Sequence, residues 1–132
     1  MKQVIALLIT LLAAVPAAAQ KDFGGVVRFD STVHDFGKVD TRDGAVNCSF
    51  EVTNIGSGTL NIFAVVTTCG CTTATWTRED IAPGAKGRID VTYTNDEGPY
   101  PFDKTLTVYV SGQEKPIILH IKGTAFTGRK HK

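Results

Sequence analysis

The sequence carries almost no net charge, because its 14 Lys and Arg residues are balanced by 13 Asp and Glu residues. A protein that binds nucleic acid usually presents a basic surface, since it must neutralise phosphates. The one run of basic residues is at the C-terminus, in Arg129–Lys132, and chain ends of this kind are commonly frayed. We therefore expect no nucleic-acid partner, and a basic flexible tail over residues 127–132.

The sequence also lacks the motifs that mark common enzymes. It has no His-Glu-x-x-His metalloprotease motif, no glycine-rich phosphate loop and no G-x-S-x-G nucleophile elbow. The adjacent carboxylates Asp96 and Glu97 stand in a polar, proline-containing stretch and are interpreted as solvated turn residues rather than an acid–base pair. These absences predict a protein that is not an enzyme and has no cofactor.

A long apolar run occurs only at the N-terminus, from Val4 to Val15. It follows the basic Lys2 and precedes Pro16 and the small residues Ala17–Ala19, which is the pattern of a secretory signal peptide. The alternative is an uncleaved membrane anchor, but the run is shorter than the roughly 20 residues that cross a bilayer. We expect residues 1–19 to be removed before Gln20, leaving a periplasmic or extracellular protein without a transmembrane helix.

The rest of the chain has no convincing helical stretch and is typical of short β-strands. Apolar and polar residues alternate in several segments, which is the period of a strand with one buried face. The segments are 26–29, 46–53, 60–66, 89–94, 106–110 and 117–121. In 60–66 the second face is apolar as well, because of Phe63 and Val65, which predicts a strand covered on both sides.

Strands at intervals of about 8–12 residues are typical of an antiparallel sandwich. The sequence therefore predicts an all-β fold, a single immunoglobulin-like antiparallel β-sandwich of about seven to eight strands. The predicted domain covers residues 28–126, and residues 20–27 form a lead-in. The Cys…Trp…Cys pattern of antibody domains is missing, so the fold is expected to be immunoglobulin-like rather than a true antibody domain.

The three cysteines are the residues with the clearest potential for chemistry. Cys69 and Cys71 are separated by a single glycine, and a disulfide between them closes a ring worth only about 1.6 kcal/mol in chain entropy. A bridge from Cys48 to either one would be worth about 3.4 kcal/mol on the same basis. That bridge needs the strands around Cys48 and Ile62 to lie in opposite sheets. Otherwise Cys48 is interpreted as a thiol in the core.

Three interpretations of Cys69 and Cys71 stay open at this stage. They form a structural or redox-labile disulfide, they bind a soft metal such as Cu(I) or Zn(II) as thiolates, or they are inert or paired with another chain. A closed zinc site usually has four ligands, and only His34, His120 and Cys48 offer additional ones. No base stands beside them in the sequence to lower a thiol pKa.

Trp76 is the only tryptophan of the chain and follows the cysteine pair closely. Its structural role would be to cover one end of the sandwich. Its functional role would be to contact a partner beside the cysteine loop, since exposed tryptophans are effective anchors.

Several blocks of the sequence resemble a family of secreted bacterial proteins. They are His34–Val39, Phe50–Gly56, Leu60–Ile62, the Cys-Gly-Cys-Thr motif at 69–72, Ile81–Gly84 and Lys104–Val108. The family is the domain-of-unknown-function family numbered fifteen seventy-three, which is similar to hydin-type and major-sperm-protein-type Ig folds. The resemblance implies an exported sandwich of seven or eight strands in the bacterial envelope, with no established biochemical role. Cys48 departs from the family pattern.

Most residues in these blocks are expected to be structural. Phe36 is expected in the core, followed by a turn at Gly37 that Asp35 braces through backbone amides. His34 belongs to the same structural block. The other members of the structural set suit turns between strands, and they are Asn54, Gly56, Pro83 and Gly84.

These observations predict an exported, non-enzymatic interaction module of the cell envelope that binds an unidentified protein or envelope partner. The contact would be made by the end carrying Cys69–Trp76 or by an open sheet edge. Two alternatives remain: a thiol-redox or soft-metal protein that uses Cys69 and Cys71, and a purely architectural domain.

Overall fold

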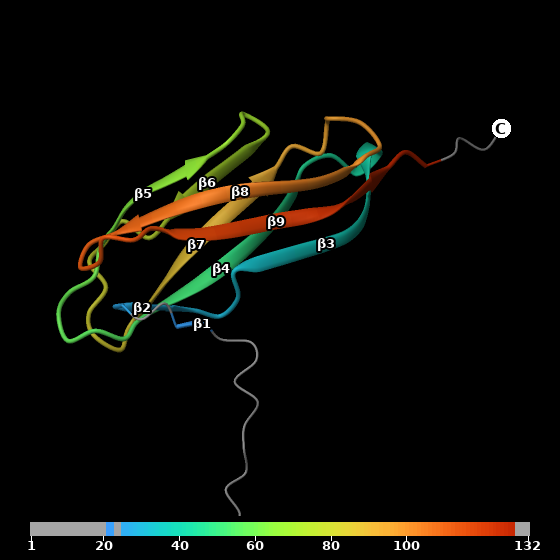
Figure 1. Cartoon of the computed structure of the whole chain (residues 1–132). Helices are drawn as coiled ribbons and strands as arrows, with labels where there is room; N and C mark the ends of the chain where they lie inside the picture. The colour runs from blue at the N-terminus through green and yellow to red at the C-terminus, as the bar shows by residue number, and fades with distance from the viewer. Residues whose placement is uncertain (1–20, 23–24, 129–132) are drawn as a thin grey trace, which may run out of the picture.

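The computed structural model describes residues 21–22 and 25–128, and its regular secondary structure is β-strand apart from one 3-10 turn (Figure 1). The predicted leader, residues 1–19, and the last four residues of the tail lie outside the described residues. Among the described residues, no helix has the length and apolar character needed to cross a membrane. The strands are β1 (Lys21–Asp22), β2 (Val27–Phe29), β3 (Val33–Asp40), β4 (Val46–Asn54), β5 (Ile62–Thr67), β6 (Thr72–Trp76), β7 (Lys86–Tyr93), β8 (Pro101–Val110) and β9 (Ile117–Phe126), with a 3-10 turn η1 (Thr41–Asp43).

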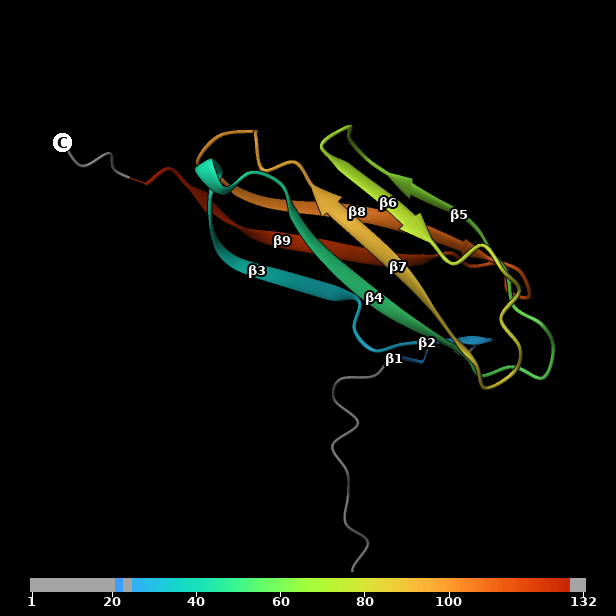
Figure 2. The same cartoon turned by 180° about the vertical axis from the view of Figure 1, so that it is seen from behind.

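The strands form two sheets that pack face to face as a sandwich (Figures 1 and 2). One sheet has five strands in the order β1-β2-β4-β7-β6, and the other has four in the order β3-β9-β8-β5. This architecture confirms the predicted all-β sandwich. The sheets meet through inward-facing residues, such as the pair Phe50 and Ile89 in one sheet and the pair Leu106 and Leu119 in the other.

The core explains why the alternating segments fold as strands. In β7 every second residue is buried, and in β4 the inward residues are partly buried up to Cys48 and buried from Phe50 onward, each opposite a residue of the partner strand. Fully burying one such apolar side chain is worth about 1.5–3 kcal/mol. The side chains buried completely or nearly so are Val27, Phe29, Phe50, Val52, Leu60, Ile62, Ile89, Val91, Tyr93, Leu106, Val108, Ile117, Leu119 and Ile121.

One strand pair differs from the predicted antiparallel arrangement. β3 pairs with β9 in parallel, with Val33 opposite His120 and Asp40 opposite Phe126. Antiparallel neighbours are commonly joined by a tight turn, whereas parallel neighbours need a long connection. Most of the chain connects β3 to β9, so the pair is free to be parallel.

The β3 strand was not predicted as a strand because a bulge interrupts it. The pairing register shifts between Asp35 and Lys38, and Gly37 adopts a φ of 69°, a conformation that glycine takes without steric cost. The amide of Gly37 donates to Asp35 Oδ1 at 2.8 Å. The brace expected from Asp35 is therefore present, but it supports a bulge within a strand.

The segment 60–66 also differs from its prediction. Its strand begins at Ile62, while Leu60 forms an isolated bridge with Ile81. The second face is not covered at Phe63, which is 61% exposed. The register shifts between Ile62 and Ala64, so that Val65 packs against the core and Val66, expected on the buried face, is 52% exposed. β5 is the last strand of its sheet, and the outer face of the sandwich has no further layer to bury these side chains.

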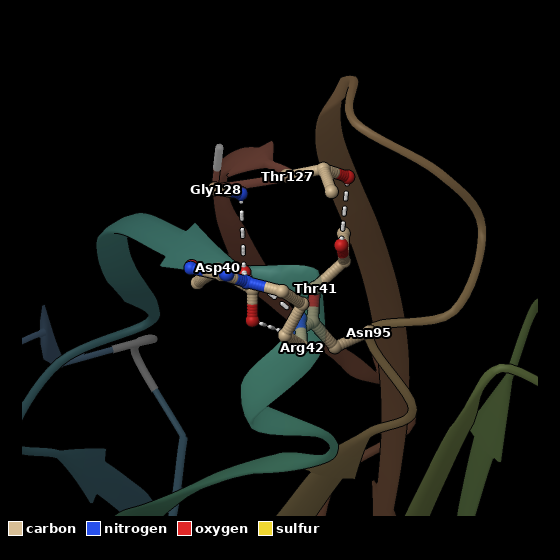
Figure 3. A network of polar contacts seen from close by, with 6 residues as sticks. All are labelled: Asp40, Thr41, Arg42, Asn95, Thr127 and Gly128. Atoms are coloured by element: carbon tan, nitrogen blue, oxygen red, sulfur yellow. Dashed lines mark hydrogen bonds and ion pairs between the residues drawn. The ribbon is translucent and has the colours of Figure 1, made fainter. Parts of the chain in front are cut away.

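A polar network anchors the loop between β7 and β8 to the turn η1 (Figure 3). The side-chain amide of Asn95, with a φ of 60°, donates to the carbonyls of Asp40 at 2.9 Å and Gly44 at 3.0 Å. Asp40 in turn caps η1 by accepting from the Arg42 amide and pairs with the Arg42 guanidinium at 2.7 Å. The loop that carries Asp96 and Glu97 is thereby held in place.

Candidate functional site

The candidate site is the β5–β6 corner, which we define as β5, β6 and the loop 68–71 that joins them. Both views place the two strands side by side along one lateral edge of the sandwich, although they belong to different sheets (Figures 1 and 2). Among the described strands, β5 is hydrogen-bonded in its sheet to β8, and β6 to β7. The corner therefore contains an edge of each sheet.

The hydrogen-bond pattern of β6 shows which backbone groups face the free edge. The Thr94 amide donates to the Cys71 carbonyl at 2.9 Å, and the Thr77 amide donates to the Arg88 carbonyl at 3.0 Å. Because such bonds alternate along an antiparallel pair, residues 71, 73, 75 and 77 bond to β7. The amide and carbonyl of Ala74, between them, point away from β7 along the edge.

Of the two edge strands of the corner, β6 lacks the features that usually protect sheet edges, whereas the pairing of β5 with β8 shifts register between Ile62 and Ala64. Natural edges carry charges, prolines or bulges that discourage pairing with another strand, and β3 has both charges and a bulge. Between Glu51 and Arg78 the sequence has no charged residue and no proline, and the pairing of β6 with β7 has no register shift. This uncharged stretch is a signal in the sequence for an unprotected edge. The alternation of apolar and polar residues does not reveal it, because uncharged polar residues and charged residues count alike in that pattern.

Trp76 lies at the end of β6 and links the two edges. Its indole Nε1–H donates to the Ile62 carbonyl at 3.1 Å, and the Arg78 guanidinium lies 4.0 Å from its ring centroid. The ring packs against the core yet remains partly exposed. Its inner contacts cover the end of the sandwich, and its exposed part is available beside the free edge of β6.

The tip of the corner holds the cysteine pair. Cys69 and Cys71 form a disulfide, with their Cα atoms 5.2 Å apart. The turn is supported by the Thr72 amide, which donates to the Cys69 carbonyl at 3.3 Å. Both cysteines are partly buried, so the sulfur atoms lie at the surface of the sandwich end rather than within its core.

In the structure, the carboxylate of Glu97 lies beside the cysteine pair. One sulfur atom from each cysteine and a Glu97 carboxylate oxygen all lie within 4.8 Å of one another. The sequence analysis interpreted Glu97 as a solvated loop residue. The contact arises from tertiary structure alone, because the β7–β8 loop, anchored through Asn95, folds over the tip of the corner.

Two side chains from β7 and β8 orient the Glu97 carboxylate. The Tyr93 hydroxyl donates to it at 2.7 Å, and Lys104 Nζ lies 2.9 Å from Oε1. These hydrogen bonds, first that from Tyr93 and then that from Lys104, lower the pKa of Glu97. Burial, followed by the bond to Glu97, raises the pKa of Tyr93. Glu97 is thus an anion at neutral pH and a poor proton acceptor.

Cys48 is the free cysteine and lies apart from this cluster in the chain, on β4 opposite Val91 of β7. It is partly buried against the core, and burial, followed by the charge of Asp90, raises the pKa of its thiol to about 11. Strands β4 and β5 do lie in opposite sheets, but the disulfide joins Cys69 to Cys71. The two histidines considered as ligands have other contacts: His34 packs edge-on against Phe36, and His120 hydrogen-bonds Asp103.

The remaining motif residues shape turns and the bulge of β3. The Asn54 side chain is 1% exposed; it donates to the carbonyls of Gly58 and Ile81, each at 2.8 Å, and accepts from the Gly56 amide at 2.9 Å. Gly84, after Pro83, has a φ of 81° in the turn before β7. Phe36 packs partly against the core, with its ring centroid 6.2 Å from that of Phe102.

Solved structures similar to this chain share its fold at low sequence identity. A protein of unknown function from Porphyromonas gingivalis W83 is 24% identical with a TM-score of 0.66, over 86% of this chain and 51% of that one, so this chain spans about half its length. The ASH / PapD-like domain 7 of human CEP192 is 8% identical with a TM-score of 0.66, over 79% and 87%. The C. elegans MSP family member WR4 is 11% identical with a TM-score of 0.53, over 76% and 97%.

The comparisons confirm the family resemblance, and they show that the fold is shared with a PapD-like domain and a major-sperm-protein family member. They do not address the Cys-Gly-Cys-Thr motif. No curated protein matches the sequence. Residues 27–125 match a family profile that covers nearly all of the described domain. The chain therefore belongs to the family described as Protein of unknown function (DUF1573).

Proposed function

We propose that this protein is an exported interaction module of the bacterial cell envelope that binds an extended segment of a partner protein along the free edge of β6. The observation that carries the proposal is the unprotected edge itself: β6 is uncharged, regular and unpaired on the side of Ala74. Adding a strand to such an edge is a common mode of peptide recognition, in which backbone bonds give affinity and side-chain contacts give specificity.

The side chains around this edge suit an added strand. Thr72, Ala74 and Trp76 point inward along β6, and the last two are partly exposed. A partner strand would bring its own inward side chains against the open part of Trp76. The outward residues Thr73 and Thr75 are exposed threonines, which neither repel a neighbouring strand nor force it out of register.

The proposal that the protein is exported depends on residues 1–19, which have the pattern of a secretory signal peptide. The experiment for this part is mass spectrometry of the protein recovered from a bacterial periplasmic extract, alkylated with and without prior reduction. We expect a chain that begins at Gln20, with a single thiol alkylated before reduction and three after it. A chain that keeps residues 1–19 in the cell interior would contradict the envelope location.

The edge is tested by placing a photo-reactive phenylalanine analogue at Thr75 on β6 in cells, and at Thr107 on β8 as the control. Thr107 faces outward from the middle of the other sheet. We expect a defined cross-linked partner from position 75 and none from position 107. Equal capture from both positions would show contact without a preferred edge, and capture from 107 alone would assign binding to the outer face of the four-stranded sheet. Either result would overturn the proposal.

The captured partner then permits a quantitative test. Ala74→Pro removes an amide that points away from β7, and Thr75→Lys places a charge on the edge. Each is expected to weaken binding at least about tenfold, which corresponds to about 1.4 kcal/mol. Trp76→Ala is also expected to weaken it, whereas Thr107→Lys should leave affinity unchanged. Circular dichroism of each variant checks that the sandwich is retained.

A further inference from the structure

We propose that reduction of the Cys69–Cys71 disulfide creates a zinc site made of the two cysteine thiolates and the Glu97 carboxylate. The three potential ligand atoms already lie within 4.8 Å of one another. Zinc is bound at about 2.3 Å by thiolate sulfur and at about 2.0–2.2 Å by carboxylate oxygen. Tetrahedral ligands at these distances are about 3.5–3.8 Å apart, so the opened disulfide and the carboxylate need only small side-chain movements.

The carboxylate oxygen of Glu97 favours zinc over Cu(I). Cu(I) favours sulfur ligands alone, whereas zinc accepts a mixture of thiolate and carboxylate. With three protein ligands the fourth position is left for water or for a ligand from another molecule. This is the open form of a zinc site, and it needs none of His34, His120 and Cys48, whose side chains have other contacts.

The charges around the cluster balance in both redox states. In the oxidised chain the carboxylate of Glu97 is matched by the ammonium of Lys104, 2.9 Å away. In the reduced, metal-bound chain two thiolates and one carboxylate carry three negative charges, and Zn²⁺ with Lys104 carries three positive charges. The two cysteines are partly buried and Glu97 is exposed, and a divalent ion fits this site better than a monovalent one because it leaves the ligands and Lys104 with no net charge.

The loop from β7 to β8 positions the carboxylate in advance. Asn95 fixes this loop to the turn η1 through two hydrogen bonds of 2.9 and 3.0 Å. Tyr93 and Lys104 then orient the carboxylate from β7 and β8. Contacts of this kind, made to a ligand by residues outside the coordination sphere, are typical of metal sites and tune their affinity.

The redox step requires a dithiol reductant, such as a reduced dithiol oxidoreductase. It supplies two electrons and two protons: the Cys69–Cys71 bond breaks, two thiols form, and the reductant becomes a disulfide. Zinc then displaces one proton from each thiol as it binds. Oxidation removes both anionic sulfur ligands and leaves a single carboxylate, so the oxidised chain has no comparable affinity.

The test compares oxidised protein with protein reduced by a phosphine under anaerobic conditions, each titrated with Zn²⁺ against a chromophoric chelator. We expect one zinc ion per reduced chain and none per oxidised chain. Cd²⁺ in place of Zn²⁺ should produce a sulfur-to-metal charge-transfer band only after reduction. Zinc binding of equal strength in the oxidised chain, or its absence in the reduced chain, would overturn the proposal.

Matched variants assign the ligands. Glu97→Gln keeps the shape of the side chain but removes its charge, and we expect it to weaken zinc binding at least about tenfold, while Asp96→Asn beside it leaves the affinity unchanged. Cys69→Ser should abolish stoichiometric binding, and Cys48→Ser should not alter it. Unchanged zinc affinity in Glu97→Gln would show that the carboxylate is not a ligand, and loss of binding in Cys48→Ser would relocate the site.

Discussion

The indole of Trp76 donates a hydrogen bond of 3.1 Å to the carbonyl of Ile62 and so ties the edge strand of one sheet to the edge strand of the other. We predict that Trp76→Phe, which keeps an aromatic ring but removes the donor, destabilises the domain by about 0.5–1.5 kcal/mol. Urea unfolding measures the effect. The matched variant Tyr100→Phe, at a side chain that is 65% exposed, should change stability by less than about 0.5 kcal/mol.

Asn54 is expected to be more important for stability than its place in a turn suggests. Its buried side chain serves two carbonyls and one amide, and a buried polar group left without a partner costs about 1–3 kcal/mol. We predict that Asn54→Ala lowers the free energy of unfolding by about 2–4 kcal/mol. Asn47→Ala, at an exposed position of the same strand, is the control and should cost less than about 1 kcal/mol.

Cys48 should react slowly in the native protein. A thiol reacts as its thiolate, and the pKa of about 11 leaves little thiolate at pH 8. We predict that iodoacetamide modifies Cys48 far more slowly in the folded chain than in the same chain unfolded in urea, and that the native rate keeps rising up to about pH 11. Equal rates in the two states at pH 8 would contradict the burial of this side chain.

The Asp40–Arg42 pair should make part of the stability depend on pH. The hydrogen bond from the Arg42 side chain is the largest of the effects that lower the pKa of Asp40. A carboxyl whose pKa is lower in the folded state stabilises the fold above its unfolded pKa of about 3.9, and this stabilisation is lost as the pH falls toward the folded value.

We therefore predict that Arg42→Ala is less stable than the wild type at pH 7 and that the difference shrinks below about pH 4. NMR titration of the Asp40 carboxyl should show its pKa moving back toward 3.9 in the variant. A stability difference that stays constant from pH 7 to pH 2 would mean that Arg42 acts through packing and not through this carboxyl.

The sequence predicted the strands whose side chains alternate strictly, because those strands have one face in the core and one in water. Phe50 and Val52 in β4 and Leu119 and Ile121 in β9 are of this kind. Three edge strands were not predicted: the two-residue β1, β3 and β6. The bulge at Gly37 breaks the alternation of β3, and the threonines of β6 provide little contrast between its faces.

The disulfide was among the interpretations that the spacing of Cys69 and Cys71 left open, but the neighbour of this pair was not predictable. Glu97 lies far from the cysteines in sequence. It lies close to them in the structure because the Asn95 side chain hydrogen-bonds the Asp40 carbonyl and so holds the β7–β8 loop in place. A local sequence pattern cannot predict such a contact, because its partners lie in different parts of the chain. In contrast, the sequence itself shows that no charged residue lies between Glu51 and Arg78. This stretch contains β5 and β6, and only the topology shows that both are edge strands.

The position of β9 between β3 and β8 determines when the domain is able to form. β3 has β9 as its sole neighbour in the sheet, so it stays without a partner until the C-terminal strand has been synthesised. Contacts between such distant segments make folding slow, in the range of milliseconds to seconds. The four-stranded sheet is therefore incomplete until the strand Ile117–Phe126 is present to join β3 to β8.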